Sequence, residues 1–453
     1  VLFTRHMLHN PKNSAWPDRD RFVLSGGHAS ALLYSVLHLT GYGLSLDDLK
    51  NFRQWGSKTP GHPEYRHTNG VEVTTGPLGQ GVANAVGMAM AERHMAARYN
   101  QPGHTIVDHY TYVMCGDGDM MEGVAAEAVS LAGHLGLGKL ICLYDDNGIS
   151  IEGKTDITFT EDVEARFKAC NWNTIRVANG NDPDAIDAAI TQAKSQDEKP
   201  TLILMKTNIA HGSPGKQDSA DAHGAPLGKE EIRLTKKNLG WPEDAEFLVP
   251  EEAAAVFARC IEKGAEAENL WQARFNAYSK AYPELTKLWV DGVSGFLTFG
   301  WDNDLPTFAP TDAAIATRAA SGKVLNAIAE KLPALIGGSA DLAPSNNTFL
   351  KNDKEFQKGS YEGRNIRFGV REHAMGAIMA GMSRNAGQML RQGASQSPTC
   401  SLSSNSSTSR RAAMTSSQRV SIVMPSSARA EHDGIMRPVP VSFTTQIMQD
   451  VGA

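Results

Sequence analysis

Short apolar runs alternate with longer, Ala-rich periodic segments between residues 1 and 235. The clearest unit starts with an apolar run at 112–115, passes through a Gly-Asp-Gly turn into a helical pattern at 120–135, and ends in another apolar run at 140–144. A second unit of this kind covers 173–205. Buried strands separated by helices are typical of β-α-β units, which build parallel sheets covered by helices. We therefore predict an α/β fold with a doubly wound parallel sheet over 1–235.

The pattern changes after residue 235. Over 236–310 the apolar residues fall mostly at helical spacings, and a stretch rich in Pro and acidic residues follows, which together predict a helical connector. A second α/β pattern begins at 311 and can be followed to 384, with a helix, a strand, a polar turn and a strand-to-helix passage. This stretch is too short for a complete domain, so we expect an incomplete second α/β domain.

The last segment, 385–453, has a different composition. Between residues 395 and 427, 13 of 33 residues are Ser, and no Lys occurs after Lys358, so the segment has little apolar surface with which to offset the cost of ordering. We expect a low-complexity tail, either a disordered regulatory segment or, as the favoured hypothesis, an out-of-frame translation. Val1 stands inside an apolar stretch without signal-peptide features, so we expect the chain to begin inside a domain.

Composition excludes several classes of protein. Lys and Arg number 44 against 50 Asp and Glu, for a net charge of −6, which argues against nucleic-acid binding because no basic excess attracts phosphates. No apolar run approaches the ~20 residues needed to cross a bilayer, so we expect no membrane partner. The five cysteines form no Cys-x-x-Cys pair, which argues against a disulfide framework or a zinc site and favours a reducing compartment, the cytoplasm.

The strongest chemical signal is the turn Gly116-Asp117-Gly118, with Asn147 at the end of the next predicted strand. The glycines permit a tight turn and close approach of the backbone to a ligand, and the start of the following helix offers free N–H groups to an anion. Asp117 and Asn147 supply hard oxygen ligands at neighbouring strand ends. Either turn alone is more often structural, but the two together favour a magnesium-bridged diphosphate.

This pattern resembles the thiamine-diphosphate motif, and its surroundings resemble the transketolase family in particular. The resemblance runs nearly without gaps from residue 1 to about 384. The stretches that carry it, besides the motif, are 25–28, 58–64, 75–81, 145–150, 221–226, 338–346 and 369–375.

The resemblance implies a set of residues that bind thiamine diphosphate and its divalent cation, Mg²⁺ or Ca²⁺. Asp117, Asn147 and the backbone carbonyl of Ile149 would bind the cation. His28 and Gly118 would contact the diphosphate. The other cofactor-binding candidates are Gly76, Pro77 and Leu78, which would face the aminopyrimidine, and Asp341.

The resemblance also implies catalytic and substrate-binding residues. Glu372 resembles the glutamate that bonds the pyrimidine nitrogen and so promotes loss of the thiazolium C2 proton. His62 and His223 resemble histidines that handle protons on the ketose hydroxyls, and Arg318 and Ser345 resemble groups that bind the sugar phosphate. Without its motif, Glu372 would be interpreted as a helix-start carboxylate. Glu122 is equally a helix-start residue or a contact to a partner subunit.

The implied activity is transfer of a two-carbon ketol unit from a ketose phosphate to an aldose phosphate, with the site assembled across a homodimer. The family pattern stops after about 384, so we expect this chain to be weakly active or inactive. Pro60 to Glu64 and Asp221 to Pro226 favour transketolase over other thiamine-diphosphate enzymes such as 1-deoxyxylulose-5-phosphate synthase. A dihydroxyacetone synthase-like enzyme and a non-catalytic homologue that only binds cofactor or a partner remain alternatives.

Overall fold

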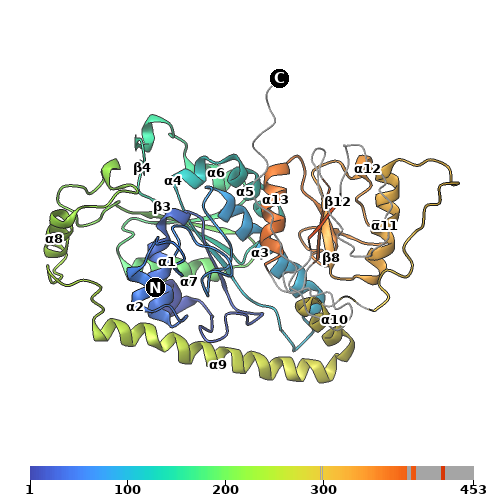
Figure 1. The fold of residues 1–453 in the computed structure, drawn as a ribbon, viewed down its shortest axis with the longest axis horizontal. Helices are drawn as coiled ribbons and strands as arrows, with labels where there is room; N and C mark the ends of the chain where they lie inside the picture. Colours follow the sequence, from blue (N-terminus) through green and yellow to red (C-terminus); the bar gives the residue numbers. More distant parts are fainter. Residues whose placement is uncertain (296, 298, 385–388, 394–419, 424–453) are drawn as a thin grey trace.

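The N-terminal part of the chain forms a five-stranded sheet in which every pairing is parallel (Figure 1). The computed structural model describes residues 1–295, 297, 299–384, 389–393 and 420–423. In spatial order the strands of this first sheet are β1 (Arg21–Leu24), β2 (Thr111–Gly116), β3 (Leu140–Asp146), β7 (Thr201–Lys206) and β6 (Asn173–Val177). A separate hairpin joins β4 (Ile149–Ser150) and β5 (Gly153–Lys154).

Helices cover both faces of the first sheet. Successive residues of a strand point to opposite faces, so Cys142 and Tyr144 of β3 pack with α3 and α5, whereas Ile141 and Leu143 pack with α7. Because both sets are buried, the strand has a continuous apolar run rather than an alternating one. The prediction of a doubly wound parallel sheet is confirmed.

The described helices include those that were predicted, and the one predicted over 120–135 is interrupted. They are α1 (Ser30–Thr40), α2 (Leu46–Lys50), α3 (Gln80–Tyr99), α4 (Asp117–Met121), α5 (Gly123–Leu135), α6 (Val163–Ala169), α7 (Pro183–Lys194), α8 (Lys229–Asn238), α9 (Glu251–Ala281), α10 (Pro283–Ser294), α11 (Thr317–Lys331), α12 (Ala343–Asn346) and α13 (Glu372–Met382). Short 3₁₀ or π turns are η1 (Leu2–His6), η2 (Gly27–Ala29), η3 (Thr155–Ile157) and η4 (Ala220–Ala222).

The single helix predicted over 120–135 was wrong. Glu122 is extended, with ψ of 131°, and separates α4 from α5. The loop before α3 packs at this point, because a Cβ on Gly79 would lie 2.6 Å from the Cβ of Glu122. Glu122 itself is exposed, and the two interpretations of its role stay open.

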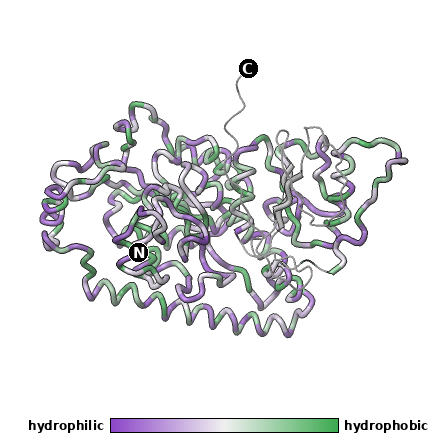
Figure 2. Tube along the Cα trace, viewed as in Figure 1, coloured by the Kyte–Doolittle hydropathy of each residue, from purple (hydrophilic) through white to green (hydrophobic). Residues whose placement is uncertain are grey.

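The long helix α9 follows the first sheet and leads to α10, in the range predicted to be helical. In Figure 1 it runs along one side of the molecule, and in Figure 2 its trace alternates between hydrophobic and hydrophilic residues. Trp271 anchors its apolar side by donating its indole N–H to the carbonyl of Ile106 at 2.9 Å. Along the described ranges, no helix has both the length and the apolar character that a membrane crossing needs.

A second sheet follows the connector. Its spatial order is β12 (Val420–Val423), β11 (Met389–Gly393), β8 (Leu335–Ser339), β10 (Asn365–Arg367) and β9 (Glu355–Phe356), and its pairings are parallel except that of β11 with β12. The predicted incomplete second α/β domain is therefore present. β11 and β12 fall within the predicted low-complexity segment 385–453, and the remainder of that segment lies outside the described residues.

Helix α13 joins the second sheet to the first part of the molecule. We call residues 1–295 the first lobe and the described residues from 297 onward the second lobe. A Cβ on Gly87 of α3 would lie 1.9 Å from the carbonyl oxygen of Ile378, and a Cβ on Gly381 of α13 would lie 1.9 Å from that of Asn84. Because no side chain separates the helices at these points, the two lobes share one hydrophobic core.

Candidate functional site

The site residues predicted in the first lobe come from loops at one edge of the first sheet. Its five strands are parallel, so their carboxyl ends face the same edge. His28 follows β1, Asp117 follows β2, Asn147 follows β3, and the segment that carries His223 follows β7. Ligands of open parallel sheets bind outside the carboxyl ends of the strands. The fold thus gathers four separate loops where such a ligand would bind.

Asp117 is a buried carboxylate held by two hydrogen bonds. Its Oδ1 accepts from the hydroxyl of Tyr144 at 2.7 Å, and its Oδ2 accepts from the backbone N–H of Gly148 at 3.0 Å. Burial raises the pKa of Asp117, the two hydrogen bonds oppose this effect, and the charges of Asp146 and Asp145 add to it. A cation would favour the charged carboxylate, and each oxygen retains a further acceptor position for one.

The turn that carries Asn147 is attached to Asp117 through Gly148. The side-chain oxygen of Asn147 accepts from the backbone N–H of Ile149 at 2.9 Å, and its amide group donates to Asp145 at 3.2 Å. Among the described residues, no group of three or more His, Cys, Asp or Glu side chains could hold a metal ion. A cation at this edge would depend on one carboxylate, one amide oxygen, one backbone carbonyl and the oxygens of its ligand. Such all-oxygen donors fit Mg²⁺ or Ca²⁺.

The three predicted histidines lie close to one another. The rings of His28 and His223 stack, with centroids 5.2 Å apart and planes inclined by 29°. The Cδ2 of His62 is 3.9 Å from the position that a Cβ on Gly76 would take. Partial burial lowers the pKa of His28, and the neighbouring rings of His223 and His62 lower it further. The Nδ1 of His223 is buried and has no hydrogen-bond partner in the described part of the chain, so a ligand could satisfy it.

The loop 76–78 packs on the loops that follow β1 and β2. A Cβ on Gly27 would lie 2.9–3.1 Å from atoms of residues 75 and 76, so a side chain there would force its neighbours to shift. A Cβ on Gly118 would lie 2.7 Å from the Cδ1 of Leu78. The predicted aminopyrimidine-facing loop and the predicted diphosphate-binding loops therefore form one packed unit.

The site residues predicted in the second lobe are not joined to this group. Asp341 follows β8, Ser345 lies in α12, Glu372 begins α13 and Arg318 lies at the start of α11. All four are exposed, and within the described ranges their side chains make no hydrogen bond or ion pair. The structure brings together the first-lobe residues and leaves these four facing solvent.

A residue of the first lobe, and not Glu372, accepts a hydrogen bond from the backbone at the start of α13. The carboxylate of Glu127 accepts from the backbone N–H of Ala374 at 2.9 Å. Arg371 donates to the hydroxyl of Ser130 at 3.0 Å. Since Glu127 supplies the acceptor that a helix start requires, the carboxylate of Glu372 is available for another partner.

Sequence reasoning missed Tyr144 and Asp119, two buried residues whose hydrogen bonds hold the site loops in place. Tyr144 is 3% exposed, and Asp119 is 1% exposed and accepts three hydrogen bonds. An Asp three residues after the glycine that precedes a helix is a capping signal, so the sequence did contain a hint of Asp119. The hydroxyl of Tyr144 on β3 reaches Asp117 at the end of the neighbouring strand β2, and no local pattern indicates such a contact.

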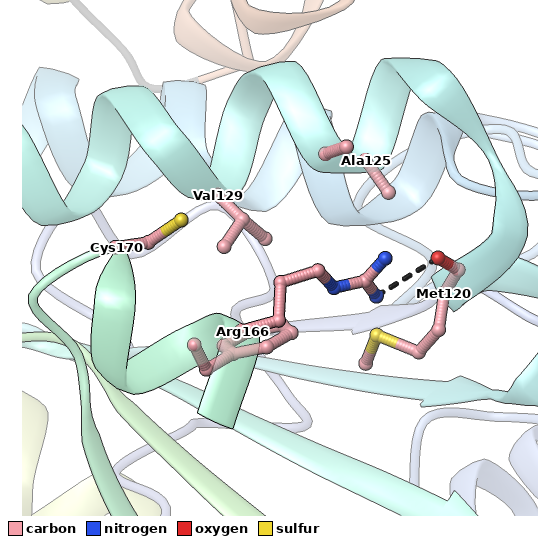
Figure 3. Close-up of a pocket in the computed structure, with 7 residues that line it drawn as sticks. Met120, Ala125, Val129, Arg166 and Cys170 are labelled. Carbon is pink, nitrogen blue, oxygen red and sulfur yellow. Dashed lines mark hydrogen bonds between the residues drawn. The ribbon is translucent and has the colours of Figure 1, made fainter. Parts of the chain in front are cut away.

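A cavity of about 80 Å³ lies between α5 and α6, and none of the residues that line it is a predicted site residue (Figure 3). Arg166 donates to the carbonyl of Met120 at its side, at 2.9 Å. Ligand pockets usually measure ~300–1,000 Å³, so this cavity is too small for a cofactor with two rings and a diphosphate. Its lining residues are Met120, Ala125, Ala126, Val129, Arg166, Phe167 and Cys170.

Comparisons with known proteins agree with this geometry. Residues 1–297 match the thiamine diphosphate binding domain of transketolase, and residues 313–434 match its pyrimidine binding domain. A transketolase from Halalkalibacterium halodurans is 57% identical over 386 residues, which cover 85% of this chain and 58% of that protein.

Solved structures agree as well. Transketolase from Leishmania mexicana superposes with a TM-score of 0.84 at 49% identity, covering 86% of this chain and 58% of that one. A Pichia stipitis transketolase in complex with sedoheptulose 7-phosphate superposes with a TM-score of 0.82, also at 49% identity, covering 84% of this chain and 57% of that one. The chain thus spans a little under three fifths of the length of these relatives. Since the first family match alone covers more than half of the chain, this protein belongs to the transketolase family.

Proposed function

We propose that the carboxyl edge of the first sheet binds thiamine diphosphate together with a divalent cation. Asp117, Asn147 and the backbone carbonyl of Ile149 would hold the cation, and His28 and Gly118 would contact the diphosphate. The residues 76–78 would face the aminopyrimidine. The observation that supports this proposal is the hydrogen bond from the Gly148 N–H to Asp117 at 3.0 Å, because it joins the two loops that carry the hard oxygen donors.

We propose that the whole protein uses this site to transfer a two-carbon ketol unit from a ketose phosphate to an aldose phosphate. When bound, thiamine diphosphate would supply the carbon nucleophile for this transfer. His62 and His223 would accept and return protons at the sugar hydroxyls, a role for which the unpaired Nδ1 of His223 is suited. Arg318 and Ser345 would bind the sugar phosphate, and the complex of the Pichia stipitis relative with sedoheptulose 7-phosphate supports this substrate class.

We propose a homodimer, in which Glu372 and Asp341 of one copy approach the first-sheet edge of another. Their exposure supports this arrangement, because a carboxylate that serves a cofactor held by a second copy is expected to face solvent in its own chain. The family pattern was predicted to end at about residue 384, but the match to the pyrimidine binding domain continues to residue 434. Because the chain spans only 58% of the length of a related transketolase, we predict that it turns over weakly or not at all. Its location in the cytoplasm, expected from the cysteine pattern, stays a prediction.

Calorimetry and a transfer assay test these proposals separately. Titration of the chain with thiamine diphosphate should give saturable binding in Mg²⁺ and none in excess EDTA, because the cation carries the diphosphate. No binding in either condition would contradict the proposed cofactor site. Ketol transfer to ribose 5-phosphate rather than to formaldehyde would favour transketolase over a dihydroxyacetone synthase-like enzyme. Binding without any transfer would support the non-catalytic alternative for this chain.

A further inference from the structure

The carboxylate of Asp119 connects three of the loops that form the site. Its Oδ1 accepts from the hydroxyl of Ser25 at 2.6 Å and from the backbone N–H of Gly79 at 2.7 Å. Its Oδ2 accepts from the backbone N–H of Gly116 at 3.0 Å. The side chain of Asp119 is 1% exposed and that of Ser25 is fully buried, so these contacts are shielded from water.

Each donor lies within three residues of a group that is proposed to bind the cofactor. Ser25 precedes the glycines and His28 of the β1 loop, Gly79 follows Leu78, and Gly116 precedes Asp117. The hydroxyl of Ser25 also accepts from the backbone N–H of Val82 at 3.2 Å, which ties the start of α3 to the same cluster. A shift of Asp119 would therefore move three cofactor-contacting segments relative to one another.

The chemistry of this cluster requires a carboxylate. Within the described ranges Asp119 has no ion-pair partner, so its burial depends on these hydrogen bonds, which are stronger to an ionised acceptor than to a neutral one. An amide at this position would offer a single acceptor oxygen, and its NH₂ group would face an N–H donor. At least one donor would then lose its partner.

We propose that Asp119 is a positioning residue that sets the affinity for thiamine diphosphate by fixing the loops at 25–28, 76–79 and 116–118 against one another. This inference rests on the proposed function, since it concerns the same site. Asp119 does not contact the cofactor in this proposal and acts through the three loops.

The first test compares Asp119→Asn with Glu92→Gln in the full 453-residue chain. Glu92 is also fully buried and pairs with Lys139 at 2.7 Å, but Lys139 lies at the amino end of β3, at the opposite edge of the sheet. Calorimetry in Mg²⁺ should show a Kd for thiamine diphosphate that is about 10–100-fold higher in Asp119→Asn, as expected for the loss of one hydrogen bond to a charged group. Glu92→Gln should change it by less than about twofold. Folded Asp119→Asn protein with the affinity of the wild type would overturn the proposal.

The second test needs no cofactor. In ligand-free protein, hydrogen exchange of the backbone amides of Gly79 and Gly116 should be faster in Asp119→Asn than in the wild type and unchanged in Glu92→Gln. If the wild type fails to bind thiamine diphosphate, the proposed function fails. Unchanged exchange at Gly79 and Gly116 would overturn the positioning role by itself.

A milder variant covers the case in which Asp119→Asn does not fold. Ser25→Ala removes one of the three donors to Asp119 and leaves both backbone donors in place. It should raise the Kd by about 3–10-fold, less than Asp119→Asn, because the backbone N–H groups of Gly79 and Gly116 keep their carboxylate acceptor. An unchanged Kd in folded Ser25→Ala protein would contradict the proposal.

Discussion

The carboxyl edges of the two sheets present their predicted site residues in opposite ways. At the first edge, Asp117 is 5% exposed and held by two hydrogen bonds, and the rings of His28 and His223 stack. At the second edge, Asp341 and Glu372 are exposed and have no side-chain partner among the described residues. The first edge is preorganised by its own chain, whereas the second presents groups that need a partner from elsewhere.

The open second edge does not reflect a loose second lobe. Its central helix, α13, is buried along most of its length and crosses α3 at glycine contacts. Glu127 of the first lobe accepts a hydrogen bond from the backbone N–H of Ala374 at the start of α13. The backbone that carries the second edge is therefore held firmly in place. The two edges differ in whether their predicted site side chains have partners.

We expect the largest effect on stability from a substitution at the contact between the two lobes. Gly381→Ala places a Cβ 1.9 Å from the carbonyl oxygen of Asn84, so the helices must separate, and we expect a loss of about 3 kcal/mol in the free energy of unfolding. Gly376→Ala is the matched control, because it lies in the same helix and its Cβ would meet nothing within 4 Å. Urea titrations should show it equal to the wild type or more stable by up to ~1 kcal/mol. Equal destabilisation by both variants would mean that the crossing is not a tight contact.

Substitutions at the two edges should show how much each edge contributes to the binding of thiamine diphosphate. Asp117→Asn removes the charged oxygen ligand, and we expect the Kd for thiamine diphosphate in Mg²⁺ to rise about a hundredfold, or ~2.7 kcal/mol. Glu372→Gln should raise it by less than about tenfold, because the diphosphate and cation remain held at the first edge. Calorimetry on both variants measures the difference. Similar losses would show that the first edge does not bind the cofactor by itself.

The stability of the contact between the lobes should also depend on pH, because of His94. This histidine is buried, its Nδ1–H donates to the carbonyl of Tyr361 at 2.8 Å, and burial lowers its pKa to about 3. The unfolded chain binds a proton below about pH 6.5 while the folded chain does not, so this contribution is complete above pH 6.5 and declines as the pH falls toward 3. From pH 7 to pH 5 it amounts to about 2 kcal/mol.

His94→Asn keeps an N–H donor and removes the titration. Its stability should therefore fall by about 2 kcal/mol less than that of the wild type between pH 7 and pH 5. Urea unfolding of both proteins at the two pH values gives this difference directly, because the other groups titrate alike in both. Parallel losses in the two proteins would refute the role of His94.

The sequence predicted the fold well where the signal is local. The strand runs at 112–115 and 140–144 and the helices of the connector lie where their periodicity placed them. The break at Glu122 was missed, because it arises where the loop before α3 packs against that residue. Asp119 and Tyr144 were missed for the same reason, since their partners come from other loops or strands. Spacing along the chain indicates candidate ligand-binding groups but not the groups that hold them in place.

The smallest expected change in stability, at the start of α13, tests whether Glu372 has a structural role. If the start of α13 depends on the acceptor of Glu127, then Glu127→Ala should lower the free energy of unfolding by about 1 kcal/mol, because the backbone N–H of Ala374 loses its partner. Glu372→Ala should stay within about 0.5 kcal/mol of the wild type, since its carboxylate is exposed and has no partner in the described part of the chain. Urea titrations at low ionic strength would include any contribution of Glu372 to the helix dipole. A loss at Glu372 as large as that at Glu127 would make it a helix-start carboxylate. A negligible loss would leave the exposed carboxylate without a structural reason, as expected of a group that serves a second copy.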